Sequence, residues 1–364
     1  MRHYLYLVLL FFYCLAFSQN VKEKRYFVEA NYFYGNILPH NNAIKHLITS
    51  HPEGVLLGVN RKTDGAAAWQ SDYNFPDYGL SFQYQANKNE ALGDLYGLYG
   101  HYNFYFLKRN LQFRIGQGIA YSTNPYDKET NFRNFAYSTR LMPSTYFMLN
   151  YNKQHIWKGV GFQAGLLFVH HSNANMKAPN TSTNTLAFTA GLNYNFDKQE
   201  PEYTVVKDTS RFTEPLRYNL VFRSGVNESD VIGSGQYPFY VASAYLDKRI
   251  NRKSAFQLGA DVFWSRYLKE YIRYMAIAYY EKNKDPDVDY KRAGVFIGHE
   301  LFVNRLTFEA QLGYYVYNPA KIYGPFYQRI GLKCYLTDNV FGALSLKTHA
   351  AKAEALEFGL GIRL

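Results

Sequence analysis

A histidine and a serine two positions apart mark the place where an apolar strand of this sequence changes its chemistry. Successive side chains of a β-strand point to opposite faces, so His170 and Ser172 share the face of the apolar run that ends at Phe168. His171 falls on the other face. A serine hydroxyl becomes a strong nucleophile when an adjacent base takes its proton. The pair therefore predicts a hydrolytic site.

A third group normally orients the base of such a pair. Asn184 begins the next apolar strand and has the same parity as Leu186 and Phe188. If the two strands form a hairpin, Asn184 lies across from His170 on the same surface. Asn184 is therefore the candidate third member of the site.

The composition indicates what this surface faces. Aromatic residues make up 18% of the 364 residues, with 36 Tyr and 28 Phe, which is high for a soluble globular protein. Residues 1–18 combine a basic start at Arg2 and His3, an apolar run and a small-x-small end, which is typical of a cleaved secretory signal. No later segment offers the roughly 18 consecutive apolar residues of a membrane-spanning helix. Together these features predict an all-β fold, an antiparallel transmembrane β-barrel of the outer membrane.

Alternating apolar and polar residues predict 14 to 16 strands. The final strand is apolar on one face up to the last residue, and we expect it to close the barrel against the first strand. The predicted strands are 25–37, 54–62, 78–85, 95–106, 111–119, 139–151, 155–172, 186–196, 218–226, 237–250, 254–266, 292–303, 306–317, 326–336, 340–348 and 356–364.

The connections between these strands predict the orientation. If the N-terminus lies in the periplasm, every tight turn falls on the periplasmic side and the loop 173–183 lies outside the cell. Two long segments, 63–77 and 197–216, are exceptions on the periplasmic side. We expect 197–216 to join two parts of one barrel domain covering residues 19–364, with a linker between two domains as the alternative. The tight turns are 108–110, 152–154, 251–253, 304–305 and 337–339.

Other kinds of site are disfavoured. The net charge of +11 is spread along the chain, which argues against nucleic-acid binding. Without the signal the chain keeps one cysteine, Cys334, so neither an intramolecular disulfide nor a cysteine zinc site is expected. His101 and His349 are predicted to point into the barrel, and His299 to be structural. Gln117 is the one polar break on the apolar face of its strand.

The stretch 162–196 resembles the lipid A 3-O-deacylase family of the PagL type. The resemblance rests on the His-x-Ser-Asn motif at 170–173, on Ala174, on Pro179-Asn180, and on Asn184 before a new apolar strand. The rest of the chain resembles longer proteins of Bacteroidetes-type bacteria labelled acyloxyacyl hydrolase or PagL-related. That second resemblance rests on residues 347–350 and 357–361, and the hairpin of the PagL type is expected at 155–196.

The resemblance implies an outer-membrane esterase that hydrolyses an acyl ester of lipid A, or lipopolysaccharide, at the lipid-facing wall of the barrel. It implies His170 as the base, Ser172 as the nucleophile, and Asn173 and Asn180 around the oxyanion site. No metal or other cofactor is expected. The family pattern has Glu where this chain has Asn184, which can orient a histidine through its carbonyl oxygen but lacks the full charge.

A non-catalytic outer-membrane barrel, a channel or a surface-binding protein, is the alternative function. Its main support is the length of the chain, because characterised members of the family are smaller barrels and a wider barrel would have room for solutes. The two functions differ in whether Ser172 and His170 are needed.

Overall fold

The computed structural model describes residues 25–197, 203–205, 212–279, 285–350 and 352–364. The fold is all-β and contains sixteen antiparallel strands, as the alternation predicted. The predicted signal, residues 1–18, lies outside the described residues. No helix in the described part of the chain is long and apolar enough to cross a membrane.

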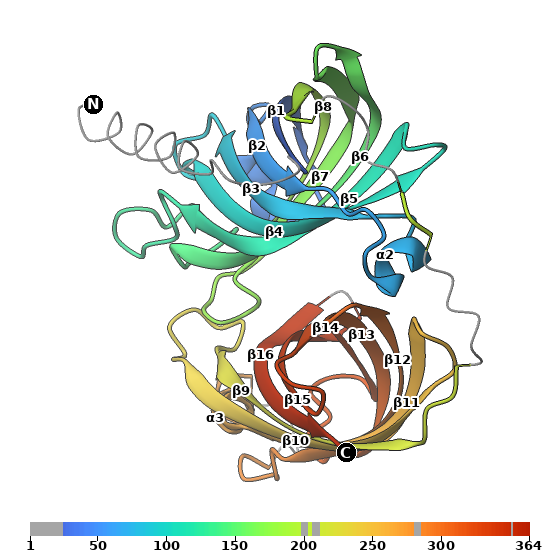
Figure 1. Cartoon of the computed structure of the whole chain (residues 1–364). Helices are drawn as coiled ribbons and strands as arrows, with labels where there is room; N and C mark the ends of the chain where they lie inside the picture. Colours follow the sequence, from blue (N-terminus) through green and yellow to red (C-terminus); the bar gives the residue numbers. More distant parts are fainter. Residues whose placement is uncertain (1–24, 198–202, 206–211, 280–284, 351) are drawn as a thin grey trace.

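The first eight strands form one closed barrel (Figure 1). The barrel closes because β8 pairs with β1 along its length, from Phe27 opposite Asn195 to Ile37 opposite Thr185. Its strands are β1 Tyr26–Ile37, β2 Glu53–Arg61, β3 Asp77–Ala86, β4 Leu95–Phe106, β5 Leu111–Ser122, β6 Leu141–Trp157, β7 Val160–His171 and β8 Thr183–Asn195.

The last eight strands form a second closed barrel, in which β16 pairs with β9. Its strands are β9 Arg217–Asn227, β10 Tyr237–Arg249, β11 Ser254–Ser265, β12 Arg292–Val303, β13 Leu306–Tyr317, β14 Phe326–Tyr335, β15 Val340–His349 and β16 Lys352–Arg363. Helix α3, Arg266–Ala278, lies in the long connection after β11.

The expectation of a single barrel was wrong, and so was the expectation that the last strand closes against the first. The alternation of side chains determines which face of each strand is apolar, but not which strands are neighbours at the point of closure. Both β8 and β16 pair with the first strand of their own half. The segment 197–216 therefore connects two barrels, which agrees with the alternative prediction of a linker between two domains.

One predicted turn was also wrong. The hairpin between β6 and β7 turns at Lys158–Gly159, where both residues have a positive φ, and not at 152–154. Strand β6 continues to Trp157 across a register shift after Lys153. Two short helices lie in the connections of the first barrel: η1, Asn42–Leu47, falls in the polar stretch after β1, and α2, Ala68–Asp72, lies between β2 and β3.

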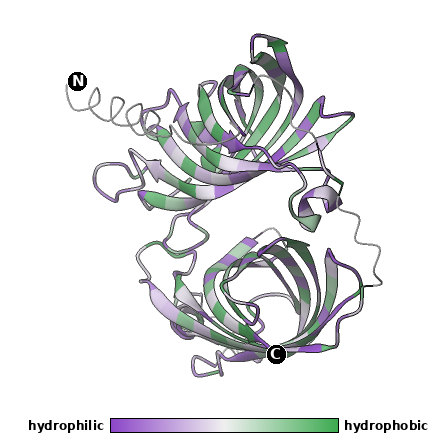
Figure 2. Ribbon diagram, in the orientation of Figure 1, coloured by the Kyte–Doolittle hydropathy of each residue, from purple (hydrophilic) through white to green (hydrophobic). Residues whose placement is uncertain are grey.

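Polar side chains fill the interior of both barrels. Each strand alternates hydrophobic and hydrophilic residues along its length (Figure 2). Arg114 and Glu29 form a buried ion pair in the first barrel, and Arg329 pairs with both Asp261 and Glu357 in the second. An eight-stranded barrel is just wide enough for its interior to be filled by side chains. The predicted interior positions of His101, His171 and His349 are confirmed by their burial inside the barrels.

The two barrels contact each other through their connections at both ends. At the end with the short turns, Tyr73, just after α2, donates from its hydroxyl to the carbonyl of Phe302 at 2.7 Å. Lys253 donates from Nζ to the carbonyl of Asp72 at 2.9 Å. At the other end, the β7–β8 loop lies against the β9–β10 loop (Figure 1).

Candidate active site

His170 and Asn184 lie directly opposite each other on β7 and β8, and both point outward from the first barrel. His170 Nδ1 lies 2.6 Å from Asn184 Oδ1. A carbonyl oxygen only accepts hydrogen bonds, so this contact assigns the ring proton to Nδ1 and leaves the lone pair on Nε2. The predicted pairing of these two residues across a hairpin therefore has the geometry of an oriented base.

Ser172 lies just beyond the end of β7, so hydrogen bonds of the loop determine its position. Its Oγ accepts from the backbone N–H of Ala174 at 3.1 Å and from Asn180 Nδ2 at 3.0 Å. Ser172 is only 8% exposed, whereas strand alternation alone predicted a side chain that points outward from the wall. No hydrogen bond joins His170 and Ser172 among the described contacts.

The side chain of Asn180 connects two other residues of the β7–β8 loop, Ser172 and Asn173. Its side-chain amide faces the Ser172 hydroxyl, and its Oδ1 accepts the backbone N–H of Asn173 at 2.9 Å. Asn173 has a different position: its side chain is fully buried and donates to Ser138 Oγ at 3.1 Å and to the Lys177 carbonyl at 2.7 Å. The structure therefore brings Asn180 to the serine hydroxyl, while the Asn173 side chain holds the loop.

The long loop before β6 supports the β7–β8 loop from one side. The backbone N–H of Thr181 donates to Phe135, and that of Ser182 donates to Ala136, at 3.0 and 2.8 Å. Tyr137, the next residue of that loop, is fully buried, and burial raises the pKa of its hydroxyl, so it stays protonated. These contacts restrict the residues that follow Asn180.

The second barrel supports the same loop from another side through Glu228, which is 2% exposed. One carboxylate oxygen of Glu228 accepts the backbone N–H of Ala178 at 2.9 Å, and the other accepts that of Gly235 at 3.0 Å. The Glu228 backbone also exchanges hydrogen bonds with Asn175. Sequence reasoning missed this residue, because nothing in a local pattern links two loops fifty residues apart.

A polar row extends from the site across the outer wall. Gln117 on β5 is directly opposite Thr145 on β6, and Thr145 is directly opposite His170. Thr145 Oγ1 donates to Gln117 Oε1 at 2.6 Å. The sequence marked Gln117 as a polar break, and the structure places that break two strands from His170.

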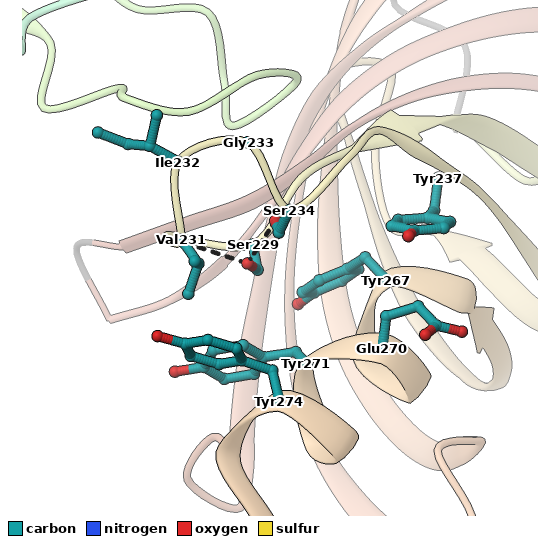
Figure 3. Close-up of a pocket in the computed structure, with 10 residues that line it drawn as sticks. All are labelled: Ser229, Val231, Ile232, Gly233, Ser234, Tyr237, Tyr267, Glu270, Tyr271 and Tyr274. Carbon is teal, nitrogen blue, oxygen red and sulfur yellow. Dashed lines mark hydrogen bonds between the residues drawn. The ribbon is translucent and has the colours of Figure 1, made fainter. Parts of the chain in front are cut away.

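The cavity in Figure 3 lies elsewhere, between the β9–β10 loop and α3 of the second barrel. It has a volume of about 370 Å³ and contains none of the candidate residues. Ser229, which follows Glu228 in the sequence, lines the cavity, and its hydroxyl contacts that of Ser234 at 2.8 Å. The candidate residues lie on the first barrel and the β7–β8 loop, away from this cavity. The described residues also hold no cluster of three side chains that could bind a metal ion.

No curated protein matches the sequence. Among solved structures, a mutant of Rh. blastica porin is 8% identical over 93% of this chain and 99% of the porin, with a TM-score of 0.19. A structure described as a bacterial polysaccharide outer membrane secretin is 9% identical over 95% of this chain and 100% of its own, with a TM-score of 0.21. Both TM-scores are too low to indicate a shared fold.

Two family models match, one for each barrel. Residues 53–193 match the model of lipid A 3-O-deacylase (PagL), and this range contains the whole candidate site. Residues 216–364 match the C-terminal domain of acyloxyacyl hydrolase and cover the second barrel. The chain therefore belongs to the PagL-type family of lipid A 3-O-deacylases, which are outer-membrane β-barrels.

Proposed function

We propose that this protein is a serine esterase that removes an acyl chain from lipid A at the outer, lipid-facing wall of its first barrel. The observation that supports this most directly is the oriented base: His170 is held at 2.6 Å by Asn184, next to a serine whose hydroxyl already contacts two hydrogen-bond donors. Family membership supplies the substrate class.

In this mechanism the Ser172 hydroxyl turns from Asn180 toward His170 when the substrate binds. His170 Nε2 takes the hydroxyl proton, and Ser172 Oγ attacks the ester carbonyl carbon. His170 then protonates the departing sugar oxygen, which leaves an acyl-enzyme. A water molecule, deprotonated by His170, attacks the acyl-enzyme and releases the fatty acid and the free serine.

Two donors near Ser172 suit the negative charge that develops on the carbonyl oxygen. The backbone N–H of Ala174 and the Nδ2 of Asn180 lie 3.1 and 3.0 Å from Ser172 Oγ, so both are close to the carbon that the serine attacks. Fixed donors at such a position are among the largest contributions to acyl-transfer catalysis. We assign the oxyanion site to these two groups, with Asn173 holding the loop that presents them.

The site needs no enclosed pocket in this proposal, because acyl chains of the outer leaflet already lie along the wall. Outward residues below His170, such as Phe162 and Leu166, are exposed and apolar. The channel alternative loses its main support, since the chain forms two eight-stranded barrels with filled interiors instead of one wide barrel. Reconstitution into liposomes is expected to give no ion conductance.

Mass spectrometry of lipid A from outer membranes tests the proposal. Cells that express the wild type are expected to contain lipid A that lacks one acyl chain, whereas cells expressing Ser172→Ala keep the full set. Ser224→Ala, an outward serine that bonds to the Phe239 carbonyl on the second barrel, is the matched control and should behave as the wild type. Identical lipid A with the wild type and Ser172→Ala would contradict the proposal.

We also propose that the protein is exported with a signal that is cleaved after residue 18. N-terminal sequencing of protein purified from outer membranes should then begin at Gln19. A sequence that begins at Met1 would contradict cleavage.

A further inference from the structure

Two polar side chains interrupt the apolar outer wall of the first barrel beside His170. The register places Gln117 opposite Thr145, Thr145 opposite His170, and His170 opposite Asn184. All four side chains point outward, so they form one polar row that crosses β5 to β8. His170 and Asn184 belong to the proposed esterase site, whereas Gln117 and Thr145 have no role in it so far.

Polar residues are rare at this level of the wall. Between the rims, the other outward residues of the described first-barrel strands are aliphatic or aromatic side chains, alanine, glycine or proline. Polar outward residues such as Asn36, Glu53 and Arg61 lie near strand ends. Placing a polar group against hydrocarbon costs free energy unless the group is hydrogen-bonded. We therefore expect this polar pair to have a role other than contact with water.

The pair leaves hydrogen-bonding capacity toward the outside. Gln117 Oε1 accepts from Thr145 Oγ1, and Gln117 Nε2 donates to the Ser144 carbonyl at 3.2 Å. The second Nε2 proton and the lone pairs of Thr145 Oγ1 have no protein partner among the described contacts. A donor and an acceptor side by side match a hydroxyl or an amide, which can do both.

There is also room beside the pair. Gly100 on β4 is directly opposite Gln117, and a Cβ atom built on Gly100 would meet no atom within 4 Å. On the side away from His170, the row therefore ends beside open space at Gly100, which has no side chain to cover Gln117. A ligand group can approach Gln117 there without displacing protein atoms.

We propose that Gln117 and Thr145 form a substrate subsite that binds a hydroxyl or amide group close to the ester that is cut. This inference rests on the proposed esterase function. Residues directly opposite on neighbouring strands are about 5 Å apart, so the subsite begins one strand from His170 and ends two strands, about 10 Å, from it. Only a polar group within a few bonds of the ester carbonyl reaches it, and plain acyl esters gain nothing from the pair.

Hydrolysis of defined esters by the purified full-length protein in detergent micelles tests this subsite. One pair of probes is nitrophenyl dodecanoate and nitrophenyl β-hydroxydodecanoate, and the other is the dodecanoyl ester of N-acetylglucosamine and that of deoxyglucose. The wild type is expected to prefer the polar member of one pair about tenfold in kcat/KM. The first pair identifies a hydroxyl on the acyl chain, and the second identifies the amide of the sugar.

The double variant Gln117→Leu/Thr145→Val should lose that preference and still hydrolyse nitrophenyl dodecanoate at the wild-type rate. Its matched control is Gln328→Leu/Thr348→Val, which removes a Gln–Thr pair with an oxygen–oxygen distance of 3.3 Å from the outside of the second barrel. The control should keep the preference. A wild type without preference, or a double variant that retains it, would overturn the subsite.

A binding measurement separates this inference from the proposed function. If the wild type hydrolyses no ester and leaves lipid A intact, the esterase proposal fails. Calorimetric titration of the Ser172→Ala protein with β-hydroxydodecanoyl amide and with dodecanoyl amide then still tests the pair. Tighter binding of the hydroxylated amide, lost on Gln117→Leu/Thr145→Val, supports the subsite, and equal binding of the two amides overturns it.

Discussion

The two barrels have the same number of strands and the same antiparallel closure, yet they differ inside. In the first barrel the interior is mainly amide and hydroxyl side chains, with the Arg114–Glu29 pair among them. The second barrel is cross-linked by charge, because Arg223, Arg329 and Arg292 each pair with buried carboxylates. Its buried acidic partners include Asp261, Glu309, Glu354 and Glu357.

The outer walls differ as well. Each barrel has an outward histidine within a strand, His170 on β7 and His299 on β12. His170 is bonded to Asn184 and belongs to the polar row, whereas His299 packs edge-on against the ring of Phe256 at 5.6 Å between ring centres. Two copies of one architecture thus differ in what surrounds the histidine. The fold supplies a wall, and the chemistry depends on the residues placed on it.

Replacing His170 and His299 in separate variants should produce the largest difference in hydrolysis rate between the two barrels. His170→Ala removes the proposed base, and hydrolysis of nitrophenyl dodecanoate should fall about a thousandfold or more. His299→Ala removes a ring contact on the second barrel and should leave the rate within about twofold of the wild type. Stopped-flow release of nitrophenolate measures both, and equal losses in the two variants would mean that neither histidine acts as a specific base.

Breaking the charge network should selectively destabilise the second barrel. Glu357 is fully buried, accepts from Arg329 Nε at 2.6 Å and from Ser345 Oγ at 3.0 Å, and lies 3.7 Å from Arg223 Nε. Glu357→Gln leaves buried guanidinium charge uncompensated, which costs about 3 to 5 kcal/mol of free energy of unfolding.

Urea unfolding in lipid vesicles can assign this loss to one barrel. Trp264 lies on β11 of the second barrel, so its fluorescence in a Trp69→Phe/Trp157→Phe background reports on that barrel. The control is Glu53→Gln, which removes an exposed pair with Lys88 on the first barrel and should not move the midpoint. An unchanged Trp264 midpoint in Glu357→Gln would show that the network is not needed for stability.

The sequence was sufficient to predict the strands, because side-chain alternation is a local property of each segment. It also predicted that His170 and Asn184 share a surface, and the register places them directly opposite. The closure into two barrels could not be predicted this way, since the pairing of β8 with β1 joins residues more than 140 positions apart. Local alternation is the same whichever strand becomes the neighbour.

The position of Ser172 also depended on distant contacts. Strand parity applies only up to His171, and beyond it hydrogen bonds with Asn180 and Ala174 determine where the hydroxyl lies. The support from Glu228 connects this loop to the other barrel, and it is visible only when both barrels are placed together. Residues on the strands were therefore predictable, whereas residues that hold the loop were not.

Substitutions at Asn184 test how the first barrel orients its histidine. Asn184→Ala removes the acceptor at Nδ1 and should lower hydrolysis of nitrophenyl dodecanoate about ten- to a hundredfold. Asn184→Glu keeps an acceptor and adds a charge that stabilises the protonated ring, so its rate should equal or exceed that of the wild type. Steady-state kinetics of the three proteins decide this, and equal rates in all of them would remove Asn184 from the site.

The smallest expected effect on catalysis comes from removing the support that the second barrel gives to the β7–β8 loop of the first barrel. Glu228→Ala removes the acceptors for the backbone N–H groups of Ala178 and Gly235. Ala178 lies two positions before Asn180 in the loop. The loop that holds Ser172 should then be less ordered, and kcat should fall about tenfold while KM changes little. Amide hydrogen exchange of residues 173–182 should speed up in parallel, which a simple change in substrate binding would not produce.

Asp230→Asn is the matched control, because Asp230 lies in the same loop as Glu228 but pairs with Lys352 at the surface. It should leave both kcat and the exchange rates unchanged. If Glu228→Ala keeps the wild-type kcat while exchange in the loop accelerates, the second barrel orders the loop without affecting the chemistry. If neither quantity changes, the two barrels act independently, and the contact between their loops only determines how they pack.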